Sequence, residues 1–205
     1  MIEVAQEDLE REDTPNVTFA IADVETDDLG ETYDYAFGRL GTQFFANPVP
    51  ALRNVCRTLA PGALLNIVVW RRKLDNDWLH KAEQIVEQYL DHPEESDEPT
   101  CGPGPFAMAN ADTVSDMVKF AGYEDIALAR CDLPFKIGNN LDQAVAYNMA
   151  IGPGAEILRL WGDRVEEIRP TIQGALHEGL AEFVTDDGTV VASSSTWIVS
   201  GRAPG

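Results

Sequence analysis

The feature that most limits the possible folds is an apolar run that directly follows an amphipathic helix. Residues 63–70 (ALLNIVVW) are apolar at seven of their eight positions, and Asn66 is the exception. Asn47 and Pro48 indicate where the helix begins, because a capping side chain is followed by proline at the first helical position. Apolar residues then recur at helical spacing, at Leu52, Val55, Cys56 and Leu59. Pro61 and Gly62 are predicted to end this helix.

Such an apolar strand directly after a helix is typical of the centre of a parallel sheet that helices cover. Further strands are predicted at residues 17–22 (VTFAIA), 35–37, 126–133 and 190–200. Helices are predicted before residue 12, at 77–90 and 114–121, and two or three times within 141–183. No repeat or linker divides the chain, so the sequence predicts a single α/β domain over residues 1–205.

One long segment, residues 91–105, fits no regular element. It contains four prolines, two glycines and five carboxylates. A loop of this length in a compact domain is often a lid or a segment beside the substrate. A solvated acidic loop is an equally good interpretation.

Charge and cysteine content exclude several classes of function. The chain has 15 Lys and Arg against 35 Asp and Glu, a formal charge of -20, which repels nucleic acid and anionic lipid. Cys56, Cys101 and Cys131 are widely spaced, with no CxxC pair, which argues against a metal site or a disulfide framework and favours the cytoplasm. No run approaches the roughly 20 apolar residues that span a bilayer. We therefore expect neither a nucleic acid nor a membrane as partner.

Several segments, in order, resemble the later motifs of class I S-adenosylmethionine-dependent methyltransferases. They are IADVE, YDYAFGRLGTQFF, LRNVCRTLAPGALLNIVVW, GPFAM, AGYEDI and TWIVSGRA, and they extend the resemblance over residues 1–204. The most similar group is the small-molecule branch that includes the quinone-biosynthesis C-methyltransferases. The resemblance implies a doubly wound, Rossmann-like sheet with helical insertions, S-adenosyl-L-methionine as cofactor, and methyl transfer to a small-molecule acceptor.

The resemblance also implies roles for individual residues. Asp23 takes the position that binds the adenine amino group, and Val24 that of the adjacent backbone contact. Gly38 and Arg39 take positions beside the methionine and sulfonium end of the cofactor. From the residues alone, an Asp at the end of a strand is more often a turn or capping residue.

A substrate pocket is implied at Phe44, Phe45 and Trp70, although the two phenylalanines fit ordinary core packing equally well. No catalytic residue is assigned. His80, His92 and His177 lie in predicted helices or in the acidic loop, where a structural or solvated role explains them better.

The front of the chain departs from the family. No GxGxG occurs, and the opening MIEVAQ resembles the helix after the family's second strand. We therefore expect an N-terminally truncated domain whose sheet lacks its first two strands. The strand at residues 17–22 would then lose its neighbour, and S-adenosylmethionine would bind poorly. The missing loop also supports an alternative, a non-catalytic protein with this fold that acts through a homo-oligomer or other partner contacts.

Overall fold

A computed structural model describes residues 2–12, 15–30, 32–91 and 102–205. Its helices and strands are, in order, α1 (Ile2–Glu12), β1 (Tyr33–Arg39), α2 (Pro48–Arg57), β2 (Leu59–Trp70), α3 (Asp77–Val86), α4 (Ala111–Phe120), β3 (Glu124–Gly138), α5 (Leu141–Ala150), α6 (Pro153–Trp161), α7 (Arg169–Leu180) and β4 (Val190–Arg202). Short 3-10 turns lie at η1 (Thr42–Phe44), η2 (Lys73–Asp75), η3 (Gly162–Val165) and η4 (Ala181–Phe183). Within these ranges, every helix is too short or too polar to cross a membrane.

The sheet has four strands in the order β1-β2-β4-β3. β1 and β2 are parallel, with Phe37 opposite Asn66. β4 runs antiparallel to both β2 and β3. The expected mixed α/β fold is therefore confirmed, and the apolar run 63–70 occupies an inner strand of the sheet.

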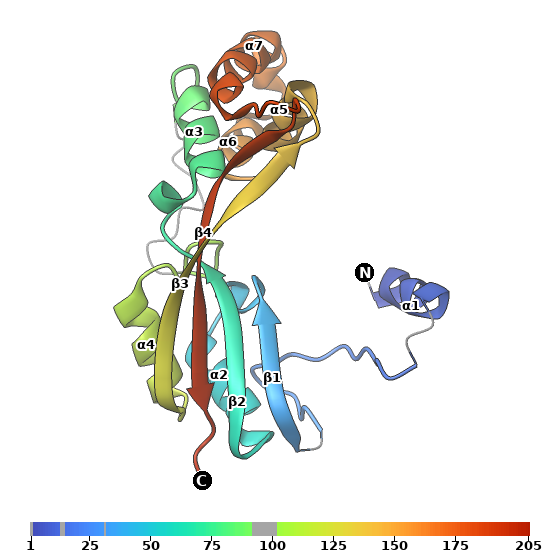
Figure 1. The fold of residues 1–205 in the computed structure, drawn as a ribbon, viewed down its shortest axis with the longest axis vertical. Coiled ribbons are helices and arrows are strands. Elements are labelled where there is room, and N and C mark those ends of the chain that lie inside the picture. The colour runs from blue at the N-terminus through green and yellow to red at the C-terminus, as the bar shows by residue number, and fades with distance from the viewer. Residues whose placement is uncertain (1, 13–14, 31, 92–101) are drawn as a thin grey trace.

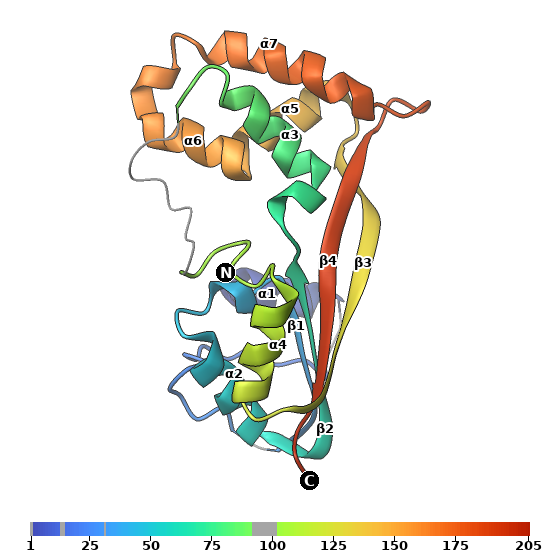
Figure 2. The ribbon, with the colours of Figure 1, turned by 90° about the vertical axis from the view of Figure 1, so that its left-hand side faces the viewer.

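One face of this sheet carries the first hydrophobic core. Figure 2 shows α2 and α4 on the same side of the sheet. Between them and the sheet lie Leu52 of α2, alternate residues of β2, and Val114 and Val118 of α4. The opposite face is more open, and there the Asn66 amide donates a hydrogen bond to the Tyr35 hydroxyl at 3.0 Å.

A second core lies in the helical region formed by α3, α5, α6 and α7. Its buried members include Trp78, Val86, Ile157, Ile172 and Leu176. Figure 1 shows that the long antiparallel pair β3–β4 runs from the sheet into this region. The prediction of two or three helices within 141–183 is confirmed, with three.

The predicted strand at residues 17–22 is wrong. Residues 17–23 form neither helix nor strand, and Ile21 is 88% exposed. A strand needs a neighbour for its backbone hydrogen bonds, and β1 pairs only with β2 among the described strands. An apolar sequence alone does not create that neighbour.

The boundary expected at Pro61 and Gly62 is also wrong. The helix already ends at Arg57, and β2 begins at Leu59. Gly62 has a φ of +76°, and the register between β1 and β2 shifts beside this segment, between Tyr33 and Tyr35. The Pro-Gly pair therefore makes the first part of β2 irregular, where glycine tolerates the left-handed backbone.

Candidate functional site

A cleft of about 540 Å³ lies where β1 and β2 end. Its walls come from the segment after β1, from Arg72 after β2, and from the segment that leads into α4. The lining residues are Thr42, Gln43, Phe45, Ala46, Pro48, Arg72, Gly102, Pro103, Phe106, Ala107, Met108, Ala109, Asn110, Thr113 and Met117. The carboxyl ends of parallel strands are where α/β folds bind ligands, so this cleft is the candidate site.

Gln43 holds these walls together. The side chain is only 2% exposed, and its Oε1 accepts a hydrogen bond from the Trp70 N–H at 3.4 Å. The Gln43 carbonyl accepts the Gly104 N–H at 3.1 Å. Gln43 therefore connects the end of β1, the end of β2 and the segment before α4.

Thr42 lies in the cleft wall with its hydroxyl buried. The residue is 8% exposed, and its hydroxyl has no hydrogen-bond partner among the described residues. A buried polar group without a partner is uncommon in folded proteins.

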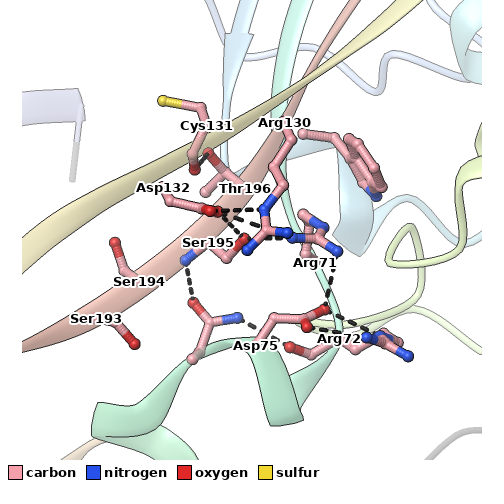
Figure 3. Close-up of polar contacts among 12 residues, drawn as sticks. Arg71, Arg72, Asp75, Arg130, Cys131, Asp132, Ser193, Ser194, Ser195 and Thr196 are labelled. Atoms are coloured by element: carbon pink, nitrogen blue, oxygen red, sulfur yellow. Dashed lines mark hydrogen bonds and ion pairs between the residues drawn. The ribbon is translucent and has the colours of Figure 1, made fainter.

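Arg72 is held at the cleft by Asp75. Its Nε and Nη2 donate to the two carboxylate oxygens of Asp75, each at 3.0 Å (Figure 3). This contact with the Arg72 guanidinium, and to a smaller extent the charge of Arg71, holds the pKa of Asp75 below its ordinary value. The two-pronged geometry fixes the direction of the Arg72 side chain.

Arg71 lies behind Arg72 and joins three elements. It is 9% exposed; its Nη1 donates to the Ser195 hydroxyl at 2.9 Å, and its Nη2 lies 3.4 Å from Asp75 (Figure 3). Its guanidinium stacks on the ring of Trp197, 4.6 Å from the ring centre. Arg71 therefore fixes the end of β2 against β4 and η2.

Asp132 of β3 completes this polar cluster. It accepts hydrogen bonds from Arg130 and from the Ser195 hydroxyl, and these contacts hold its pKa below its ordinary value. Its carboxylate also lies 3.8 Å from Arg71. The buried cation at the end of β2 thus has two carboxylates near it, which a charge in this position requires.

The residues predicted for the adenine end of the cofactor lie apart from the cleft walls. Asp23 is exposed and forms a local turn: its carboxylate accepts the Glu25 N–H at 2.9 Å, and its own N–H donates to Asp27 at 2.8 Å. The carbonyl of Val24 accepts a hydrogen bond from Asn54 at 3.0 Å. Both residues take part in this turn, and their contact with adenine stays a prediction.

Glu25 anchors this turn to α2. Its carboxylate accepts hydrogen bonds from the Asn47 side chain at 2.8 Å and from the Asn47 N–H at 2.7 Å. These bonds, the side-chain one first, lower the pKa of Glu25. The role of Asn47 therefore differs from the expected one, because its side chain makes no capping hydrogen bond within α2.

Gly38 and Arg39 lie in the last part of β1. A Cβ at Gly38 would come within 3.1 Å of Thr42 Cγ2 and 3.3 Å of Ile67 Cγ2. Glycine thus allows the segment after β1 to fold closely over the sheet. Arg39 is exposed at the end of β1, and neither residue lines the cleft.

The three residues predicted for the substrate pocket lie in three different environments. Phe45 lines the cleft, whereas Phe44 is 54% exposed and does not. Trp70 packs edge-on against Trp78, with ring centres 6.0 Å apart, in the helical core. Trp70 contributes to the cleft indirectly, because its backbone N–H donates a hydrogen bond to Gln43, which lines the cleft.

Sequence reasoning indicated the loop at residues 38–45 and the segment after Trp70 as binding segments, which contain Thr42, Gln43 and Arg72, but it did not name these three residues individually. Their position directly after two predicted strands indicated them, because ligands bind at that edge of the sheet. Phe106 and Met108 lie within the GPFAM motif, which had been noted only for its resemblance.

The cleft lining contains no Asp, Glu, His or Cys among the described residues. His80 and His177 lie in α3 and α7, and His92 lies outside the described residues. Within the described ranges, no group of three or more such side chains could hold a metal ion.

No protein-family model and no curated protein matches the sequence. Solved structures do. A Bacillus halodurans protein described as a candidate methyltransferase is similar over all of this chain and 79% of its own, with 16% identity and a TM-score of 0.56. The YcgJ protein of Bacillus subtilis is similar over the same shares, with 14% identity and a TM-score of 0.55.

A third similar structure is phosphoethanolamine N-methyltransferase 2 of Haemonchus contortus, in complex with phosphomonomethylethanolamine and S-adenosylhomocysteine. The match covers all of this chain and 41% of that one, with 17% identity and a TM-score of 0.50. At such low identity the likeness shows the fold alone. The chain therefore has the Rossmann-like fold of class I methyltransferases.

Proposed function

We propose that the chain serves S-adenosylmethionine-dependent methyl transfer to a small molecule and that the cleft holds the methyl acceptor. The observation that carries the proposal is the position of the cleft, at the carboxyl ends of β1 and β2 in a sheet with the methyltransferase fold. The cysteine usage favours the cytoplasm as the place of this reaction.

The lining suits a flat, largely apolar acceptor with one or two polar groups. Phe45, Phe106, Met108 and Met117 supply aromatic and thioether surface, which adapts to planar rings. Arg72 and Asn110, which also line the cleft, offer polar atoms for such groups of the acceptor. A hydroquinone ring fits this description and agrees with the sequence resemblance to the quinone-biosynthesis branch.

The acceptor must also bring its own reactivity. The described lining offers no carboxylate, imidazole or thiol that could act as a general base. An activated ring carbon needs none, and orientation of the two reactants in the cleft supplies much of the rate. Carbon is therefore the attacked atom that the cleft favours.

The cofactor side of the site is less complete. S-adenosylhomocysteine is bound in the Haemonchus contortus enzyme, and we propose S-adenosylmethionine as the methyl donor here. The described residues fit it poorly, because Asp23 lies in an exposed turn where its carboxylate already accepts the Glu25 N–H, and the sequence contains no GxGxG. No step of the transfer is therefore assigned to a residue of this chain.

The absence of GxGxG from the sequence leaves one alternative function. A methyltransferase fold without a formed adenine site can act by binding alone, through partner or oligomer contacts. In this alternative the chain keeps the fold but does not catalyse methyl transfer.

A transfer assay separates the two. The chain is incubated with tritiated S-adenosylmethionine at high concentration and a panel of hydroquinones and phenols, and methylated product is measured. Transfer that falls in Phe45→Ala but not in Phe44→Ala supports the proposal. Acceptor binding without transfer favours the non-catalytic alternative, and an absence of both contradicts the proposal.

A further inference from the structure

Residues 2–12 and 15–22 form an arm with little support from the rest of the molecule. We define the arm as α1 and residues 15–22. α1 has no buried residue, and Figure 1 shows it standing off from the sheet beyond β1. Residues 17–22 have the composition of a strand, and they are exposed, with Phe19 and Ile21 among them. Apolar side chains in an arm of this kind are unfavourable in water.

The outer edge of β1 also lacks a partner among the described strands. β1 is an edge strand, because it pairs with β2 and with no other described strand. Its side chains Tyr33, Tyr35 and Phe37 are exposed, Phe37 by 62%. An open edge with apolar side chains is a template for pairing with another extended segment.

The base of the arm is fixed. The turn at residues 23–27 is held to α2 by Glu25 with Asn47 and by the Asn54 amide, which donates to the carbonyls of Val24 and Asp27. No described hydrogen bond joins residues 15–22 to β1 of the same chain. The arm therefore leaves the molecule from an anchored point beside an edge that it does not cover.

We propose that two copies of this chain form a dimer in which each arm pairs through residues 17–22 with β1 of the other copy. The six-residue segment VTFAIA matches the seven-residue length of β1 and has the composition of a strand. The exchange is reciprocal, so one twofold axis satisfies both arms and both edges. It gives the backbone of residues 17–22 the partner that is missing in the single chain.

Charge makes this dimer dependent on salt. Each copy carries a formal charge of -20, so two copies repel each other at low ionic strength. Salt screens this repulsion and strengthens apolar contacts, so the dimer tightens as ionic strength rises.

Sedimentation equilibrium of the wild-type chain and two proline variants tests the proposal. Ile21→Pro places proline where no described backbone hydrogen bond exists, and Asp186→Pro is the matched control in the exposed turn Thr185–Gly188, at a position that proline favours. We expect Ile21→Pro to weaken dimerisation at least about tenfold, because each of the two exchanged strands loses a donor. Asp186→Pro should dimerise as the wild type does. A monomeric wild type at high salt, or a dimer that Ile21→Pro leaves unchanged, overturns the proposal.

Cysteine trapping identifies the contact itself. One chain carries Phe19→Cys and the other Phe37→Cys, each in a background with the native cysteines changed to Ser. A disulfide-linked dimer should form between Phe19→Cys and Phe37→Cys chains when they are mixed, in excess over either chain alone. Equal cross-linking in all three samples means that arm and edge do not meet, and the proposal fails.

Discussion

Asp23 and Phe45 each follow an apolar run that the sequence predicts to be a strand, yet their surroundings differ. Phe45 follows β1, which pairs with β2, and it lies in the wall of a cleft. Asp23 follows residues 17–22, which pair with no described strand, and it lies in an exposed turn. The two positions belong to the acceptor side and the cofactor side of the proposed site.

The difference shows what a strand needs before it can position a functional residue. Both runs have the composition of a strand, but only β1 has a neighbour that fixes where it ends. Gln43 then connects that end to β2 and to the segment before α4. We infer that the acceptor side is formed in the isolated chain and the cofactor side is not.

The largest loss of stability should come from removing Arg71, which lies behind the acceptor side of the site. Arg71→Ala deletes a buried guanidinium that joins β2, β4 and η2, and leaves Asp75 and Asp132 without it. We expect a loss of about 3 kcal/mol in the free energy of unfolding, measured by urea denaturation.

Arg130→Ala is the control for this variant. Its side chain is mostly exposed, so the loss should stay below about 1 kcal/mol even though it binds Asp132. Equal losses in the two variants would mean that Arg71 does not support the site.

A second comparison uses the two neighbouring phenylalanines. Phe45→Ala removes cleft surface, whereas Phe44→Ala removes an exposed ring. Binding of a methyl-substituted hydroquinone, followed by ligand-observed NMR, should weaken about tenfold in Phe45→Ala, in line with the area lost. In Phe44→Ala the affinity should stay within about twofold. The opposite ranking would place the acceptor outside the cleft.

A smaller change in the free energy of unfolding should depend on pH. The contact with Arg72 lowers the pKa of Asp75 from its ordinary value of 3.8, so its stabilising contribution is present above about pH 4 and lost as pH falls through the folded-state pKa. Asp75→Asn should therefore lower the free energy of unfolding by about 1 kcal/mol at neutral pH. The variant and the wild type should converge once the pH falls below the folded-state pKa of Asp75, in urea titrations repeated from neutral to acidic pH. A constant difference at all pH values would show that the charge of Asp75 is not responsible.

The elements that the sequence predicted correctly depend on local signals. Pro48 and the apolar spacing after it mark α2, and Gly122 closes α4 with a φ of +107°. The apolar composition of the run 63–70 correctly predicted an inner strand, although only alternate residues of the run are buried and the other face of the sheet is more open. None of these features requires knowledge of a distant segment.

The parts that the sequence did not predict depend on contacts between distant segments. Gln43 becomes a wall residue only when Gly104 and Trp70 come to it. Residues 17–22 failed as a strand because pairing is decided by the neighbour and not by composition. For the same reason Phe44 and Phe45, adjacent and identical in type, have different exposures in the fold.

The central claim is that the isolated chain forms the acceptor side of a methyltransferase site without a formed cofactor side. Titration of the chain with S-adenosylmethionine in a calorimeter tests it most directly. The account predicts a dissociation constant of about 1 mM or weaker, with no further loss in Asp23→Asn. A micromolar dissociation constant that Asp23→Asn weakens would show that the turn at residues 23–27 is a formed cofactor site, and would contradict the account.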